Sequence, residues 1–187
     1  MKPIANTILV QDISGSMNES LHGRLTKLEA LKQANMLLLE HKRRNFPKDR
    51  LGCVLFNDSA RLLFDLTEPW DPKIERHLSL IQASGQTNMN DGLQMAIDIL
   101  TERPGRFLRN IVLLSDGFAN VGYTSQLIPI AQQAGRSGIT INTIGFGRTP
   151  KDFDETLLKS ISRSSRKGQY LHVHDLRPLA SALVNLS

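Results

Sequence analysis

Three oxygen-bearing side chains follow the first apolar run of the chain. Asp12, Ser14 and Ser16 come at alternate positions directly after the β-branched run at residues 7–10. A run of this kind that stops at an acid and two hydroxyls predicts a buried strand ending in a loop. All three side chains offer oxygen and none offers nitrogen or sulfur, which is the donor set that a hard divalent cation prefers. This stretch is therefore the first candidate for a metal site.

Two later loops carry side chains of the same kind. Asp116 follows a second strand-like run at residues 110–114, and Thr87 lies in a glycine-containing turn at residues 84–88, just before a helical pattern. Loops that adjoin core elements can meet at one edge of a sheet. We therefore expect the three oxygen-bearing loops to converge at one edge of the sheet, which is the candidate site.

The three motifs, in this order and at this spacing, resemble the von Willebrand factor A (VWA) domain family. Residues 12–17, Asp-Ile-Ser-Gly-Ser-Met, match its D-x-S-x-S motif, residues 87–93 look like its threonine loop, and residues 114–117 resemble its second aspartate loop. The resemblance covers nearly the whole chain. It implies a metal-ion-dependent adhesion site (MIDAS) on Asp12, Ser14, Ser16, Thr87 and Asp116.

Two residues depart from the family pattern. Gln86 stands where the family usually has a second glycine before the threonine, and Gln11 is polar where the first strand usually ends in apolar residues. We expect both departures to affect the geometry of the metal loops.

Alternating strand and helix patterns fill the rest of the chain. After the first strand we expect strands at 50–56, 61–64, 110–115, 139–144 and 169–174, and helices at about 27–44, 73–82, 90–103, 124–136, 154–162 and 175–186. In the first helix, Lys27 is expected on the polar face. The alternation predicts an α/β fold with a doubly wound, mostly parallel six-stranded sheet and helices on both faces. The expected strand order is 3-2-1-4-5-6 with one antiparallel edge strand, a Rossmann-like VWA fold, and we expect a single domain over residues 1–187.

Composition is that of a soluble globular protein, with 40% hydrophobic and 22% charged residues. The single cysteine, Cys53, cannot form an internal disulfide, so the cysteine content does not indicate an oxidising compartment. The N-terminal residues lack the apolar stretch of a signal peptide, and no run approaches the roughly 18 apolar residues of a membrane span. We expect a cytoplasmic protein that does not enter a membrane.

The net charge of +5 comes with basic clusters at residues 41–44, 103–109 and 163–167. A nucleic-acid surface would combine such clusters with aromatic side chains, but only 5% of the residues are aromatic. Solvated helix ends are the better interpretation of each cluster, and nucleic acid is not the expected partner.

The resemblance also implies a function. In the family the acids often hold the metal through water, which leaves one position open to a carboxylate of a partner. We therefore expect a non-enzymatic, metal-dependent protein–protein interaction module that binds Mg²⁺, with Mn²⁺ or Ca²⁺ as alternatives, and recognises a partner's Asp or Glu. Related domains serve beside AAA+ ATPases and beside kinases and phosphatases, so an intracellular adaptor in such a system is the expected role.

Other classes of function fit less well. A magnesium-dependent phosphohydrolase could use Asp12 as nucleophile, but no further acid lies near it and neither metal loop carries a lysine to steady the transferred group. A serine hydrolase would need a G-x-S-x-G motif, which the sequence lacks. A structural module with a vestigial site is disfavoured because all five oxygen ligands are present.

Overall fold

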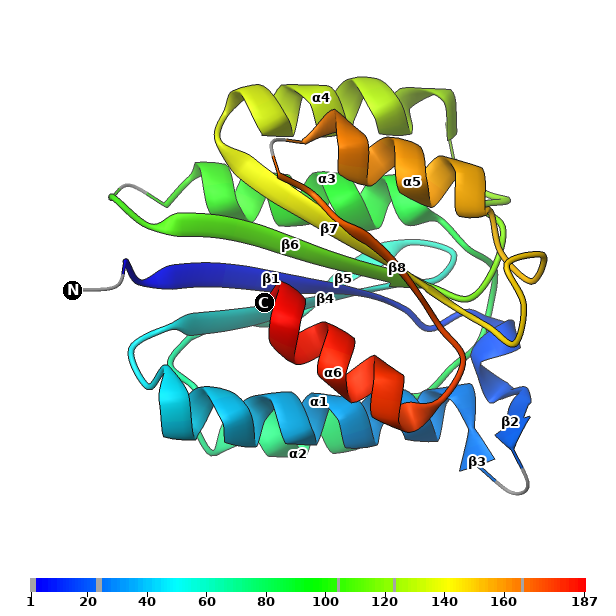
Figure 1. Cartoon of the computed structure of the whole chain (residues 1–187), viewed down its shortest axis with the longest axis horizontal. Helices are drawn as coiled ribbons and strands as arrows, with labels where there is room; N and C mark the ends of the chain where they lie inside the picture. Colours follow the sequence, from blue (N-terminus) through cyan, green and yellow to red (C-terminus); the bar gives the residue numbers. More distant parts are fainter. Residues whose placement is uncertain (1–2, 23–24, 104, 123, 166) are drawn as a thin grey trace.

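The computed structural model describes residues 3–22, 25–103, 105–122, 124–165 and 167–187, and a six-stranded sheet lies at its centre (Figure 1). The strands lie in the order β5-β4-β1-β6-β7-β8. β1, β4, β6, β7 and β8 pair in parallel, and β5 pairs antiparallel with β4 at one edge. Counted along the chain this is the predicted order 3-2-1-4-5-6, which is confirmed. The strand bounds are β1 (Ala5–Asp12), β4 (Arg50–Phe56), β5 (Ala60–Thr67), β6 (Leu108–Ser115), β7 (Ile139–Phe146) and β8 (Tyr170–Val173).

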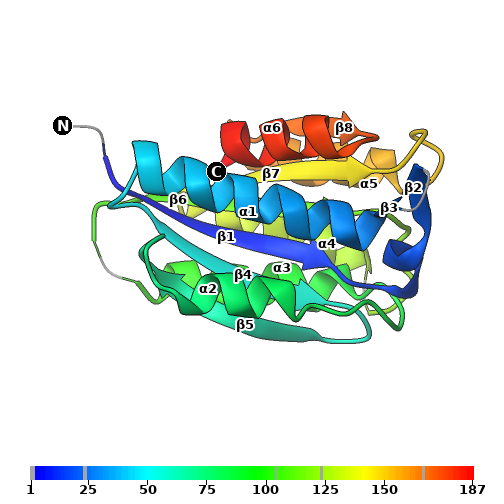
Figure 2. The same ribbon diagram turned by 90° about the horizontal axis from the view of Figure 1, so that it is seen from below.

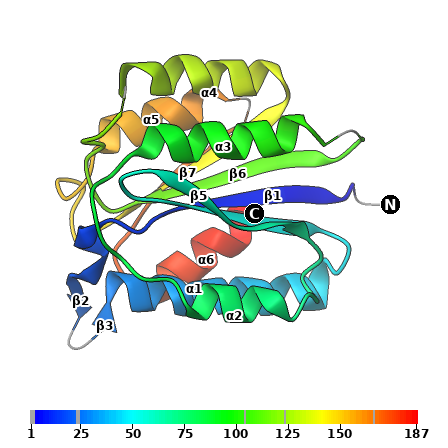
Figure 3. The same cartoon turned by 180° about the vertical axis from the view of Figure 1, so that it is seen from behind.

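Helices cover both faces of the sheet (Figures 1 and 3). Alternation along the central strand explains why: Leu9 of β1 packs among the helices of one face, whereas Ile8 and Val10 pack among those of the other. All of β1 is buried, as expected for a parallel strand between two helical layers. One layer holds α1 (Lys27–Asn45), α2 (Lys73–Ser79) and α6 (Leu176–Leu186), and the other holds α3 (Met89–Thr101), α4 (Leu127–Arg136) and α5 (Glu155–Ser164).

Helix α1 begins with the predicted capping box. Thr26 Oγ1 accepts a hydrogen bond from the Glu29 backbone N–H at 3.1 Å, and Glu29 Oε2 accepts one from the Thr26 N–H at 2.8 Å. The expectation that Lys27 lies on the polar face is wrong, because Lys27 is only 5% exposed. Side chains of a helix tilt toward its N-terminus, and in the first turn of α1 that direction leads to the carboxyl edge of the sheet.

The segment between β1 and α1 has more structure than the simple link expected from the sequence. A 3-10 turn, η1 (Gly15–Asn18), is followed by an antiparallel hairpin of β2 (Ser20–His22) and β3 (Leu25–Thr26) beyond the carboxyl end of β1 (Figure 2). Gly23 and Arg24 of this link lie outside the described residues. The hairpin carries the chain from the first metal loop to the start of α1.

The polar residue near the end of β1 is explained by a partner on α1. The Gln11 side-chain amide donates to Asn35 Oδ1 at 2.7 Å, and Asn35 Nδ2 donates back to Gln11 Oε1 at 3.0 Å. Both residues are buried, so each amide satisfies the other in a place that water does not reach. Gln11 thus fixes the position of β1 against α1.

The basic end of α1 is not fully solvated, contrary to expectation. Lys42 is 3% exposed and donates to Asp49 Oδ2 at 2.8 Å. The guanidinium of Arg43 lies 5.6 Å from the ring centroid of Trp70. The chain beyond α1 therefore supplies a carboxylate and an aromatic ring that the charge pattern did not predict. Pro104 and Arg166, within two other predicted basic clusters, lie outside the described residues.

Helix α4 begins later than predicted. A 3-10 turn, η2 (Thr124–Gln126), precedes it, and Pro129 lies in its first turn, where the missing N–H removes no helical hydrogen bond. None of the helices in the described parts of the chain has the length and apolar character needed to span a bilayer.

Candidate functional site

Three loops meet at the carboxyl edge of the sheet. The Gly15 N–H donates to the Gly85 carbonyl at 2.9 Å, which joins the loop after β1 to the turn before α3. The Thr87 N–H donates to Asn120 Oδ1 at 2.9 Å, which joins that turn to the loop after β6. The expected convergence of the three motifs is therefore observed, and Asn120 is a contributor that the sequence did not single out.

Asp12 is the most enclosed of the predicted residues, with 0% exposure. Its Oδ1 accepts from the Ser14 backbone N–H at 2.9 Å, and its Oδ2 accepts from Ser115 Oγ at 2.7 Å. Ser115 was not predicted as part of the site. Gln11 pairs with Leu114 on the adjacent strand, so Asp12 and Ser115 are the next residues in register. The amino-acid sequence does not give this register, which is why Ser115 could not be predicted.

Hydroxyl groups connect the two acidic loops. Ser14 Oγ lies 3.0 Å from Ser16 Oγ, and Ser16 Oγ donates to Asp116 Oδ1 at 2.8 Å. Ser14 and Asp116 are buried, whereas Ser16 is partly exposed. Ser16 is thus the member of this chain of contacts that an external group can reach.

Thr87 completes the group from the third loop. A methyl group built on Gly117 would lie 3.7 Å from Ser16 Oγ and 3.8 Å from Thr87 Oγ1. Both hydroxyls therefore border the same small space beside Gly117. The structure brings all five predicted residues to this one place.

The departure at Gln86 does not open the threonine loop. Gly85 has a φ of +80° and carries the left-handed conformation that glycine favours. The Gln86 N–H donates to Asp58 Oδ1 at 3.0 Å, and among the described non-glycine residues only Lys167 has a positive φ. One glycine is enough for this turn, and Asp58 holds the next residue in place.

Burial raises the pKa of both acids of the site. Burial, followed by the nearby charge of Asp116, raises the pKa of Asp12 to about 6. Burial also raises the pKa of Asp116, while its contacts with Lys27 and Ser16 act in the opposite direction. Two buried carboxylates held this close cost free energy unless a cation balances them.

A buried lysine provides part of that balance. Lys27 Nζ donates to Asp116 Oδ2 at 2.7 Å and to Glu19 Oε2 at 2.8 Å. Burial by itself lowers the pKa of Lys27, but these two contacts outweigh it and raise the pKa above its usual value. The position of Lys27 in the sequence did indicate a nearby acid, because a cation in the first turn of a helix is disfavoured by the helix dipole unless an anion lies close to it.

The donor set fits a hard divalent cation. It consists of hydroxyl and carboxylate oxygens, and the two carboxylates lie close to each other. Among the ion pairs of the described residues, Asp116 has a cationic partner and Asp12 has none. In the described residues no group of three or more His, Cys, Asp or Glu side chains is placed to hold a metal. A metal held at this edge of the sheet would therefore need the hydroxyl oxygens of Ser14, Ser16 and Thr87 in addition to the two acids.

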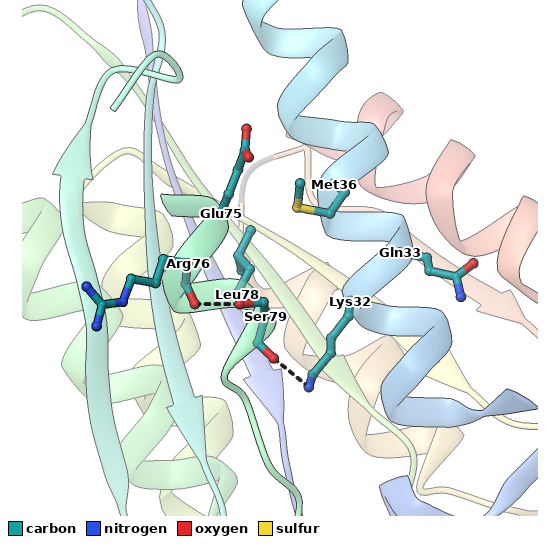
Figure 4. A pocket seen from close by; sticks show the side chains of 7 residues that line it. All are labelled: Lys32, Gln33, Met36, Glu75, Arg76, Leu78 and Ser79. Carbon is teal, nitrogen blue, oxygen red and sulfur yellow. Dashed lines mark hydrogen bonds between the residues drawn. The ribbon is translucent and has the colours of Figure 1, made fainter. Parts of the chain in front are cut away.

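A groove of about 470 Å³ lies between α1 and α2 (Figure 4). Its walls combine apolar side chains such as Met36 and Leu78 with Lys32, whose Nζ donates to the Ser79 carbonyl at 2.9 Å. None of the five predicted ligands lines it, so this groove adds nothing to the candidate metal centre.

Known proteins of the same kind share both the sequence pattern and the fold. The family profile of the von Willebrand factor type A domain matches residues 7–118. Mouse (Mus musculus) inter-alpha-trypsin inhibitor heavy chain H2 is 31% identical over 179 residues, and the match covers 89% of this chain and 18% of that protein. Uncharacterized protein sll0103 of Synechocystis sp. is 25% identical, and the match covers 86% of this chain and 36% of that protein. The chain thus spans less than half of the length of these relatives.

Solved structures agree on the fold. A von Willebrand factor type A structure from Catenulispora acidiphila has a TM-score of 0.82 at 19% identity and covers 98% of this chain and 42% of that chain. The SpRpn10 VWA domain has a TM-score of 0.76 at 22% identity and covers 100% of this chain and 96% of that chain. The three motifs meet at one sheet edge, and the family profile matches residues 7–118, which contain all three, so this chain belongs to the von Willebrand factor type A domain family.

Proposed function

We propose that the chain is a non-enzymatic protein-binding module whose interaction depends on a divalent cation. The observation that carries the proposal is the cluster in which Ser16 contacts both Ser14 and Asp116 beside the buried Asp12. The proposed ligands are Asp12, Ser14, Ser16, Thr87 and Asp116. The proposed ion is Mg²⁺, with Mn²⁺ or Ca²⁺ as alternatives of the same hard, oxygen-preferring class.

The acids and the hydroxyl groups of the proposed site have different roles. Ser115 and the Ser14 N–H hold both oxygens of Asp12, which fixes a negative charge beneath the hydroxyls. Ser14, Ser16 and Thr87 supply neutral oxygens, so they do not cancel the charge of a divalent ion. A bound ion would supply an electron-poor position for an oxygen of an incoming carboxylate. A partner's Asp or Glu is therefore the matching group.

The rim of the site suits a protein partner. Ser16 is partly exposed at its centre, Gly15 is exposed, and Phe118, two residues after Asp116, is 54% exposed. Aromatic side chains are enriched at protein interfaces relative to the rest of the protein surface. We propose an acidic residue flanked by apolar side chains on the partner, with an AAA+ ATPase or a kinase or phosphatase system as the class of partner and the cytoplasm as the location.

One observation favours the phosphohydrolase alternative and another opposes it. Lys27 does supply a lysine beside an acid of the site, although neither metal loop carries one. Asp12, however, is 0% exposed and both of its carboxylate oxygens accept hydrogen bonds. A nucleophile must touch phosphorus directly, whereas an acid can hold a metal through water, so the burial of Asp12 supports the non-enzymatic proposal.

The direct test is capture of partners from the native lysate on immobilised protein, in Mg²⁺ and in EDTA. We expect capture in Mg²⁺ only, and loss of capture with Thr87→Ala, which removes one neutral oxygen from the site. Thr101→Ala is the matched control, because Thr101 is exposed at the opposite end of α3. Substituting the acidic residues of the captured partner one by one should then identify a single Asp or Glu.

Partners that stay bound in EDTA, and that bind Thr87→Ala as well as the unsubstituted protein, would contradict the proposal. The basic end of α1 near Arg43 and Arg44 would then be the surface to substitute next.

A further inference from the structure

Lys27 is buried at the candidate metal centre at some energetic cost. Its side chain is 7% exposed, and it lies in the first turn of α1, where the helix dipole disfavours a cation. Two carboxylates compensate: Asp116, whose side chain is fully buried, and Glu19, whose side chain is 66% exposed. Among the described residues, Lys27 is the cation within ion-pair distance of a proposed ligand.

The contacts divide the Asp116 carboxylate into two sides. Oδ1 accepts from Ser16, on the side of the proposed ligands, and Oδ2 accepts from Lys27, on the far side. Glu19 gives Lys27 a second anion, so the ammonium group can withdraw from Asp116 and keep one ion pair. Asp152 lies close enough for the charge of Lys27 to contribute to its lowered pKa, after the larger effect of the Thr149 N–H.

We propose that Lys27 is a positioning residue that acts as a built-in counter-cation: it keeps the metal-free cluster folded and weakens the binding of a divalent ion. This inference rests on the proposed metal dependence of the site. Without metal, Lys27 neutralises Asp116 and leaves Asp12 as the uncompensated charge of the pair. With metal, two cations share Asp116, and their repulsion opposes binding.

The charge of Lys27 affects how tightly the site holds a divalent ion and how strongly that ion attracts a partner carboxylate. A site with both carboxylates uncompensated would hold a divalent ion tightly and leave it little affinity for a further anion. Because Lys27 cancels one of the two charges, the ion is held less tightly and remains more electropositive toward a partner carboxylate. Lys27 therefore couples ion binding to partner binding.

The test is calorimetric titration of the metal-free protein with Mn²⁺ alone, using Lys27→Met and Lys27→Gln. Both variants remove the charge, and the glutamine amide can still donate to Asp116. We expect both to bind Mn²⁺ about ten-fold more tightly than the unsubstituted protein, which is the scale expected when a like charge is removed from a partly buried site. Glu19→Gln should change the affinity in the opposite direction, because it leaves the charge of Lys27 less compensated.

Lys42→Met is the matched control. Lys42 is also a buried lysine of α1 in an ion pair, with Asp49 at 2.8 Å, at the other end of the helix. We expect all the lysine variants to lower the melting temperature of the metal-free protein. Millimolar Mn²⁺ should raise that of Lys27→Met and Lys27→Gln by more than it raises that of the unsubstituted protein, whereas Lys42→Met should gain only as much as the unsubstituted protein. A Lys27→Met protein that folds only when Mn²⁺ is added would support the inference equally.

Equal or weaker Mn²⁺ affinity in Lys27→Gln, with a native circular dichroism spectrum, would overturn the inference and leave the proposed function standing. If the unsubstituted protein binds no Mn²⁺ but the Lys27 variants do, the inference is supported, and Lys27 excludes the ion. If none of these proteins binds Mn²⁺, the inference and the metal dependence of the proposed function both fail.

Discussion

Ser115 Oγ donates a hydrogen bond to Asp12 Oδ2 at 2.7 Å and so ties the carboxyl ends of the neighbouring strands β6 and β1. Both side chains are completely buried. The orientation of Asp12 thus depends on a serine about a hundred residues away in the sequence, which directly precedes the second acid of the site.

Ser115→Ala should lower the free energy of unfolding of the metal-free protein by about 1–3 kcal/mol, because it leaves a buried carboxylate oxygen without a donor. Urea unfolding monitored by circular dichroism is the measurement. Ser160→Ala is the control, since Ser160 is half-buried and its Oγ donates to the Thr156 carbonyl of the same helix. A Ser115→Ala protein as stable as this control would show that the hydrogen bond contributes little.

Divalent metal should raise the melting temperature of the protein, because a ligand that binds only the folded state stabilises it by mass action. We expect a shift with millimolar Mg²⁺ or Mn²⁺ that Asp12→Ala abolishes and EDTA reverses. Thermal denaturation of metal-stripped protein over a range of metal concentrations is the measurement. An unchanged melting temperature at millimolar metal would count against a metal site on these residues.

The stability of the metal-free protein should fall as the pH rises through the range of Asp12. The pKa of Asp12 is about 6 in the folded state and 3.8 in the unfolded reference, so the folded state binds more protons between these values. Its contribution is therefore fully present below about pH 4 and is lost by about pH 7, a change of up to about 3 kcal/mol. Urea unfolding in EDTA, compared with Asp12→Asn at each pH, isolates this group. If both proteins vary with pH in the same way, Asp12 does not titrate in this range.

No phosphatase activity is expected on small phosphoesters such as p-nitrophenyl phosphate with Mg²⁺, Mn²⁺ or Ca²⁺. The reason is structural, since Asp12 is buried and both of its oxygens are already bonded. Initial rates should equal those of Asp12→Asn purified in the same way. Turnover that survives purification and disappears in that variant would favour the enzyme interpretation.

The pair of Gln11 and Asn35 should behave as a unit. Asn35→Leu alone leaves the buried Gln11 Nε2 without its acceptor and should cost about 1–3 kcal/mol. The double variant Gln11→Leu with Asn35→Leu should be more stable than Asn35→Leu, since no polar group is then left unpaired. Urea unfolding of the two single variants and the double variant measures the coupling, and additive losses would show that the two amides act independently.

The sequence by itself determined the order of the strands, the covering of both sheet faces and the five oxygen-bearing residues that gather at one edge. Apolar runs such as residues 110–114 define buried strands, and the connection rules of parallel sheets bring their carboxyl ends together. The choice of the five residues also rests on the resemblance of the three loop motifs to those of the VWA family. The capping box at Thr26 and Glu29 is local as well, and it fixed the start of α1.

Only the tertiary structure decided which distant groups support those five residues. Ser115, Asn120 and Lys27 gain their roles from partners that lie 103, 33 and 89 positions away, and local periodicity carries no information on such contacts. Lys27 shows the physical reason most plainly. Its place in the helical pattern is that of a solvated cation, but the tilt of side chains at the start of α1 carries its ammonium group to Asp116, and burial there makes the ion pair part of the site.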